Sequence, residues 1–239
     1  MHSTGARGTK KAAFRHGLLE DGLTIYQSDA KFWNFTEELE GTAAEILKLL
    51  IDDNYQPDDS DKAKAYQLLD EIETWKAGCD KEKKGYHAAQ NSTSDIWDAF
   101  RRAMNAKKDL DALHAIMTLE GFGKTSRTAK RATAVLRMFK PNHWGVVDWR
   151  AAAMMKQLEL SSWNVDEALR RPAHDEEPWI TYNEINDWLA CDLNEAYRKK
   201  RSAPLQRTAD VEMAIFALSF KVPRWNKNPS RTFLRGFKG

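Results

Sequence analysis

The stretch LEGFGKTSRTAKRATAVL, residues 119–136, places two glycines between two segments whose apolar residues recur at helical spacing. Its letters GKT invite comparison with a nucleotide-binding phosphate loop, which has the pattern GxxxxGK followed by Ser or Thr, after a buried strand. That pattern requires a glycine at position 118, where the chain has Thr118, and the preceding DLDALHAIMT has helical periodicity. We therefore interpret the stretch as a turn between two helices, and a nucleotide-hydrolysing protein is disfavoured.

A glycine turn between two helices can bind an anion. Gly121 and Gly123 permit positive φ angles, and the second helix offers unpaired backbone amides at its start. Phosphates of a nucleic-acid backbone suit such a site, because the helix dipole and nearby cations stabilise them. An ordinary glycine turn without a ligand is the alternative. The candidate phosphate-binding residues are Gly121, Gly123, Lys124, Thr125, Arg127 and Lys130.

Helical spacing extends along most of the chain and predicts an all-α fold. Strand-like alternation is limited to weak hints in LTIYQ, residues 23–27, and in the short VVDW, residues 146–149. Helix starts are expected at Ser94, before the DIW run, and at TEELE, residues 36–40. The apolar stripes include Ala43, Ile46, Leu47 and Leu50; Ala65, Leu68, Leu69 and Ile72; Ile96, Trp97, Phe100 and Met104; Leu110, Leu113, Ile116 and Met117; Ala129, Ala132, Leu136 and Phe139; and Ala209, Met213 and Phe216.

Charge is segregated along the 239-residue chain, although the net charge is only +2. Residues 121–150 hold seven basic residues and one acid, and residues 198–239 hold eleven basic residues and two acids. Basic segments of this kind indicate a polyanion partner, with a solvated basic face as the alternative.

Composition excludes several other classes. No apolar run approaches the roughly 20 residues of a membrane helix, and the N-terminus lacks the apolar segment of a signal peptide, so we expect a cytoplasmic, nucleoid-associated protein with no membrane partner. Cys79 and Cys191 are too few for a disulfide framework, and six scattered histidines make no zinc pattern, so no metal site is expected.

An ordered set of motifs resembles a known family. LEGFG, the alanine-rich RATAVL and then NHWGVVDWR are similar to the helix-hairpin-helix DNA glycosylases, over about residues 113–154. In that family a hairpin of the form LPGxGxxTA is followed by a hydrophobic-hydrophobic-Asp step, which Val146, Val147 and Asp148 match. RTADVEMAIFAL, residues 207–218, resembles the family's closing helix.

The resemblance implies that the protein flips a damaged or modified base out of double-stranded DNA and removes it. Asp148 would be the catalytic residue, stabilising positive charge on the sugar or activating water. As the alternative, Asp148 caps a helix that starts at Trp149. A hypermodified base of phage DNA, removed in defence, is one substrate the resemblance allows. A non-catalytic helix-hairpin-helix DNA-binding protein is the alternative function.

The sequence departs from the family pattern at several positions, and these differences change the roles that the resemblance implies. Glu120 stands where the family has proline, and the spacing from Gly123 to Asp148 is several residues longer than usual. Neither Lys124 nor Lys130 stands at the family's catalytic-lysine position, so we expect a monofunctional enzyme without strand cleavage. Two cysteines cannot bind the iron–sulfur cluster of some relatives. No cofactor is expected, although the resemblance allows a monovalent cation at the hairpin.

A flipped base needs aromatic walls and a side chain that fills the gap in the duplex. Aromatic core packing, or a polar loop before a helix cap, is the alternative for each candidate. The candidates for the base pocket or for intercalation are Trp149, Trp33, Trp97, Gln90 and Asn91.

The expected organisation is a flexible basic tail over residues 1–13 followed by one glycosylase-like unit over residues 14–239. Residues 60–150 would form the lobe with the hairpin, and residues 14–59 with 151–239 the second lobe, with the catalytic cleft between the two. The protein is expected to be a monomer.

Overall fold

The computed structural model describes residues 5–82, 85–122, 129–146 and 207–221, and within these only the backbone of residues 5–16, 129–130 and 220–221. Seven α-helices and one 3-10 helix, with no strand, make up the regular structure of this part of the chain. The all-α prediction is therefore confirmed for these residues. The helices are α1 Gly5–Ser28, α2 Ala30–Leu50, α3 Asp59–Lys76, η1 Ala88–Gln90, α4 Thr93–Asn105, α5 Asp109–Met117, α6 Ala129–Phe139 and α10 Thr208–Lys221.

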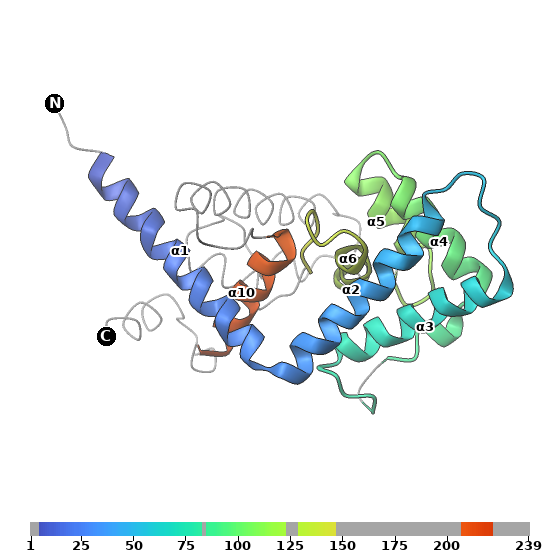
Figure 1. The fold of residues 1–239 in the computed structure, drawn as a ribbon, viewed down its shortest axis with the longest axis horizontal. Helices are drawn as coiled ribbons and strands as arrows, with labels where there is room; N and C mark the ends of the chain where they lie inside the picture. The colour runs from blue at the N-terminus through green and yellow to red at the C-terminus, as the bar shows by residue number, and fades with distance from the viewer. Residues whose placement is uncertain (1–4, 83–84, 123–128, 147–206, 222–239) are drawn as a thin grey trace.

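The helices α2 to α6 pack together, and α10 lies along α1 beside this group (Figure 1). Gly22 of α1 faces the backbone of α10 so closely that a Cβ atom there would lie within 3.0 Å of the carbonyl of Ala214. Helix α2 packs against α3, α4 and α6, although the expected lobe boundary near residue 60 separates it from them. None of the described helices combines the length and apolar character that a membrane span requires.

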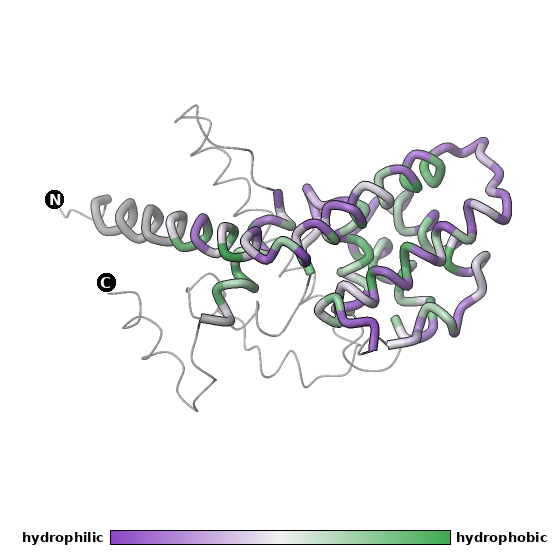
Figure 2. The backbone as a smooth tube through the Cα atoms, turned by 60° about the horizontal axis from the view of Figure 1, so that its bottom comes forward, coloured by the Kyte–Doolittle hydropathy of each residue, from purple (hydrophilic) through white to green (hydrophobic). Residues whose placement is uncertain are grey.

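The predicted apolar stripes form the core. Leu68, Leu69 and Phe100 are completely buried, as is Leu136 on α6. Leu110 is the exception, since it remains 39% exposed. Hydrophobic and hydrophilic residues alternate along the helices, whereas the loop from α2 to α3 is mostly hydrophilic (Figure 2). The 3.6-residue periodicity thus identified the inward faces of the helices.

The helix starts differ from the expected ones. Helix α2 begins at Ala30, where the Asp29 carboxylate accepts from Phe32 N at 3.2 Å, and Thr36 lies buried inside the helix. Helix α4 is capped by Ser92 and not by Ser94, because the Ser92 hydroxyl accepts from Asp95 N at 3.1 Å. The start of α4 was misplaced because Ser92 and Ser94 can both cap a helix, whereas α2 begins earlier because Phe32 and Phe35, before Thr36, already pack against the core.

The N-terminal segment also differs from expectation. Helix α1 begins at Gly5 and includes most of the tail expected over residues 1–13. It also includes LTIYQ, residues 23–27, so the weak strand hint there was wrong. The Tyr26 and Leu19 side chains are buried at helical spacing, which explains why this segment is a helix.

A capping box starts α3. Asp58 accepts from Asp61 N at 2.9 Å, and Asp61 Oδ2 accepts from Asp58 N at 3.2 Å. The Tyr55 hydroxyl donates to the same Asp61 oxygen at 2.5 Å. This hydrogen bond raises the pKa of Tyr55 to about 12 and lowers the pKa of Asp61. The loop before α3 is therefore attached to the first turn of the helix by a charge-assisted contact.

The loop after α6 is joined to the start of α10. Ala209 N donates to Pro141 O at 2.9 Å, and Thr208 Oγ1 donates to Asn142 O at 2.8 Å. The start of α10 therefore contacts the loop after α6, although Thr208 and Asn142 are 66 residues apart in the sequence.

Candidate nucleic-acid interface

The turn between α5 and α6 is described as far as Phe122. Leu119 and Phe122 are buried, with 3% and 1% of their surface exposed, and Glu120 between them is exposed. Phe122 N donates to Leu119 O at 3.0 Å and closes the turn. The two apolar side chains anchor the turn in the core, so the backbone around Glu120 lies at the surface.

Gly121 is required in this turn for two reasons. Its φ of +78° lies in the left-handed region, which side chains other than glycine rarely adopt. A Cβ atom at Gly121 would also lie within 3.0 Å of the His87 side chain. The expectation that Gly121 takes a positive φ is thus confirmed.

Several predicted site residues lie outside the described part of the chain, and nothing can be placed for them. For Lys130 only the backbone, in the first turn of α6, is described. Val147 and most of the expected second lobe after residue 150 are also outside. The site residues concerned are Gly123, Lys124, Thr125, Arg127, Asp148 and Trp149.

His87 lies behind the turn and joins three elements. Its Nδ1 is 2.7 Å from Glu73 Oε1 of α3, and its Nε2 is 3.0 Å from Arg131 Nη1 of α6. The same Arg131 nitrogen donates to Gly121 O at 2.8 Å. No spacing in the sequence connects Glu73, His87 and Arg131, and this set was therefore missed from the sequence.

Glu73 also holds the backbone that carries His87. The Glu73 carboxylate is buried, and its Oε2 accepts from His87 N at 3.0 Å and from Ala88 N at 2.9 Å. These amides lie at the start of the 3-10 helix η1, where backbone donors otherwise have no partner. A single carboxylate therefore fixes both the loop and the imidazole.

The two candidates for intercalation, Gln90 and Asn91, differ in their contacts. The Asn91 amide is occupied: it donates to His87 O at 2.8 Å and exchanges hydrogen bonds with the backbone of Glu120. Gln90 is exposed at the end of η1. The structure therefore brings both candidates next to the turn, with Asn91 bound to it.

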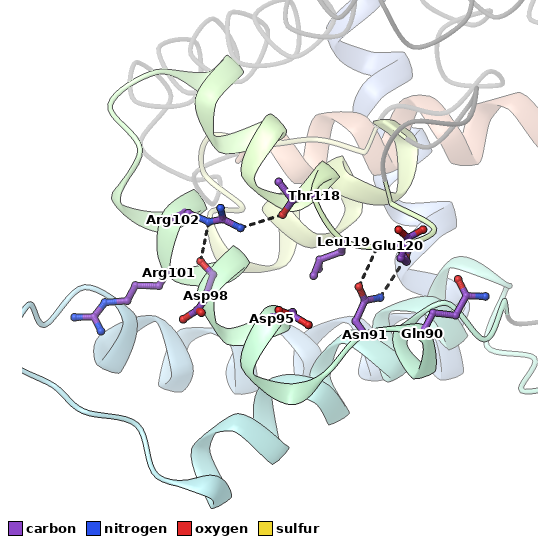
Figure 3. Close-up of a pocket in the computed structure, with 9 residues that line it drawn as sticks. All are labelled: Gln90, Asn91, Asp95, Asp98, Arg101, Arg102, Thr118, Leu119 and Glu120. Carbon is purple, nitrogen blue, oxygen red and sulfur yellow. Dashed lines mark hydrogen bonds between the residues drawn. The ribbon is translucent and has the colours of Figure 1, made fainter.

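A groove of about 630 Å³ lies beside the turn (Figure 3). Arg102 crosses it, donating from Nη2 to Thr118 Oγ1 at 3.0 Å and from Nε to Asp98 O at 3.3 Å. With three carboxylates and two guanidinium groups, the lining has no excess of cations, so a phosphate backbone does not suit the groove itself. The lining residues are Gln90, Asn91, Asp95, Asp98, Arg101, Arg102, Thr118, Leu119 and Glu120.

The two tryptophan candidates that are described lie elsewhere. Trp97 is a core residue of α4, 2% exposed, with its ring centroid 6.4 Å from that of Tyr55. Trp33 is partly buried and packs edge-on against Tyr26 in a separate cluster with α10. Burial raises the pKa of Tyr26 above its ordinary value, and the hydrogen bond between its hydroxyl and Thr36 Oγ1, at 3.1 Å, acts in the opposite direction. The structure thus places Trp97 in the main core, which also contains Leu119 and Phe122 of the turn, and Trp33 in the cluster with α10.

A second ion cluster joins α2, α6 and α10. Arg137 is fully buried and pairs through Nη1 with Glu40 Oε1 at 2.7 Å, and Arg207 pairs with the other oxygen of Glu40 and with Asp210. Burial by itself lowers the pKa of Arg207, but its hydrogen bonds and ion pairs with Asp210 and Glu40 outweigh burial and raise that pKa. Glu40 and Arg207 line a groove of about 450 Å³ near Pro141.

No protein-family model, curated protein or solved structure matches the chain.

In the described residues, no three His, Cys, Asp or Glu side chains form a group that could hold a metal ion. Of the carbonyl groups at the turn, Gly121 O is occupied by Arg131 and Leu119 O by Phe122 N.

Proposed function

We propose that the protein is a DNA glycosylase that hydrolyses the N-glycosidic bond of a damaged or modified base. The observation that supports this function is the turn from Leu119 to Phe122: it joins two helices, it is anchored by buried side chains, and its Gly121 has a φ of +78°. Because Glu120 N and Phe122 N are paired within the protein, the proposal assigns the phosphate contact to the Gly121 amide, and Asp148 follows the turn in the sequence as the resemblance requires.

In the proposed reaction the hairpin binds the DNA backbone and the target nucleotide leaves the base stack. The bond between C1′ of the sugar and the base nitrogen breaks, and the electron pair leaves with the base. Asp148 stabilises the positive charge that develops on the sugar and takes a proton from the attacking water, whose oxygen forms the new bond to C1′. The departing base takes up a proton, which balances the one that Asp148 receives from the water, and the products are a free base and an abasic site, without strand cleavage.

The proposal includes two helical lobes with the active-site cleft between them. Helices α4 to α6 belong to the lobe with the hairpin, and α1 with α10 to the other. Gln90 fits the intercalating role better than Asn91, because the Asn91 amide is already occupied by Glu120 and His87. Lys124 and Lys130 contact phosphate and do not form a covalent intermediate.

The test compares the wild type with Asp148→Asn on duplexes that carry defined modified bases and on genomic DNA with natural modifications, including hypermodified phage DNA. Released base is measured by mass spectrometry. We expect release by the wild type, a loss of about 10²–10³-fold or more in the variant, and unchanged DNA binding. Glu45→Gln, which neutralises an exposed carboxylate of α2, is the charge-matched control and should keep the wild-type activity.

The outcomes distinguish the two candidate functions. If Asp148→Asn excises base at the wild-type rate, the proposed mechanism is wrong. If no DNA yields a free base while binding is salt-dependent and improves in Asp148→Asn, the protein is a non-catalytic DNA-binding protein.

A further inference from the structure

We propose that His87 is the positioning residue of the hairpin: together with Glu73 and Arg131 it holds the Leu119–Phe122 turn in the conformation that binds a DNA phosphate. This inference rests on the proposed function only in that the turn binds DNA, and it does not depend on base excision.

The imidazole of His87 occupies a space made by two glycines. A Cβ atom at Gly121 would lie within 3.0 Å of the His87 side chain, and one at Gly85 would lie within 3.0 Å of its ring. Phe122 packs edge-on to the same ring, with the ring centroids 6.4 Å apart. The loop at residue 85 and the turn at residue 121 therefore both fit around one side chain.

The hydrogen bonds of His87 define its protonation. A guanidinium group only donates, so Nε2, at 3.0 Å from Arg131 Nη1, must accept. The ring proton is then on Nδ1 and is donated to Glu73 Oε1 at 2.7 Å. The imidazole is neutral in this arrangement, and Glu73 selects the tautomer that can accept from Arg131.

Arg131 connects the His87 side chain to the backbone of the turn. Its Nη1 donates both to His87 and to Gly121 O, at 3.0 and 2.8 Å. The Gly121 carbonyl is thereby directed towards α6, and its negative end is neutralised by the guanidinium. The Gly121 oxygen would repel an anion bound at the surface of the turn. The contact with Arg131 keeps this oxygen turned away from that surface.

The experiment uses the full chain and two variants that act through His87. His87→Ala removes the ring. Glu73→Gln keeps the shape of the side chain. The backbone amides of His87 and Ala88 hold the Gln carbonyl in the place of Oε2, so the NH₂ group donates to Nδ1 and favours the tautomer that cannot accept from Arg131. Affinity for a fluorescent duplex is measured by anisotropy over a series of KCl concentrations.

We expect each variant to bind DNA about tenfold more weakly, with the slope of log Kd against log [KCl] reduced by about 1, as for the loss of one phosphate contact. The double variant should be no worse than His87→Ala, because the two residues act in one chain of contacts.

The matched control is His143→Ala, which removes another His–carboxylate pair, His143 Nε2 to Asp109 at 2.8 Å, away from the turn. It should keep the wild-type salt slope. The inference is wrong if both Glu73→Gln and His87→Ala bind DNA with the wild-type affinity and salt slope, even if their melting temperatures change. That result would leave the proposed function intact.

A measurement on the wild type covers the case in which a variant does not fold. The ¹⁵N spectrum of the imidazole should show a neutral ring protonated on Nδ1; protonation on Nε2 alone contradicts the inference. If the wild type binds no DNA at all, the proposed function fails, and that result is separate from either outcome for the variants.

Discussion

Asn91 and Glu120 are joined by a reciprocal pair of hydrogen bonds: Glu120 N donates to Asn91 Oδ1 at 2.9 Å, and Asn91 Nδ2 donates to Glu120 O at 3.2 Å. The side chain of Asn91 therefore pairs with the backbone of Glu120 as a neighbouring strand would. The loop before α4 and the turn after α5, which are 29 residues apart in sequence, are held as one unit.

Replacing Asn91 should destabilise the fold, whereas replacing Gln90 should not. Asn91→Ala removes the two hydrogen bonds to Glu120 and the one to His87 O, and we expect a loss of about 1–2 kcal/mol in the free energy of unfolding. Gln90→Ala changes an exposed side chain and should stay within about 0.5 kcal/mol of the wild type. Urea unfolding measures both, and equal effects of the two variants would contradict the structure.

The close approach of α1 and α10 predicts opposite effects for two glycines of α1. A Cβ atom at Gly22 would meet the backbone of Ala214, so Gly22→Ala should separate the helices and reduce stability by about 1–3 kcal/mol. Gly17 has no atom within 4 Å of its Cβ position, and Gly17→Ala should stabilise the helix by about 0.5–1 kcal/mol. Thermal unfolding of the two variants tests this; stabilisation by Gly22→Ala would show that α10 does not lie against α1 there.

Replacing Glu40, whose carboxylate pairs with both Arg137 and Arg207, should reduce the free energy of unfolding more than replacing the buried Arg137. Glu40→Ala removes the carboxylate that pairs with the buried Arg137, while Arg207 retains Asp210, and we expect a loss of about 3–5 kcal/mol in the free energy of unfolding. Arg137→Met keeps the volume, leaves Glu40 paired with Arg207 and should be clearly milder. Denaturant unfolding ranks the two variants, and a larger loss for Arg137→Met would contradict this assignment.

The contact between Tyr55 and Asp61 should make stability depend on pH in the acid range. The pKa of Asp61 is lower in the folded protein than in the unfolded chain, where it is about 4. Its contribution is therefore fully present above about pH 5 and is lost as the pH falls through the folded-state pKa. Asp61→Asn should be less stable than the wild type at pH 7, with the difference shrinking below about pH 4. A difference that stays constant from pH 7 to pH 3 would contradict this assignment.

Much of the fold could be predicted because helical periodicity is a local property. The stripes through Leu69, Phe100 and Leu136 identified core faces without any knowledge of their partners. The start at Ser92 was missed because neighbouring polar residues have similar capping preferences, and the start at Asp29 was missed because packing of Phe32 and Phe35 extends α2 towards the N-terminus. The role of Asp148 stays a prediction, since Asp148 lies outside the residues that the structure describes.

By itself, the sequence determined that the chain is helical where the structure describes it, and that a glycine turn follows α5, with Gly121 in a conformation that other residues avoid. Only the tertiary structure decided what lies behind that turn. Glu73, His87 and Arg131 come from three helices or loops with no common spacing, and their hydrogen bonds exist only once α3, η1 and α6 are packed together. Periodicity reports which face of a helix is apolar, but a polar network requires distances between segments that only the packed fold supplies.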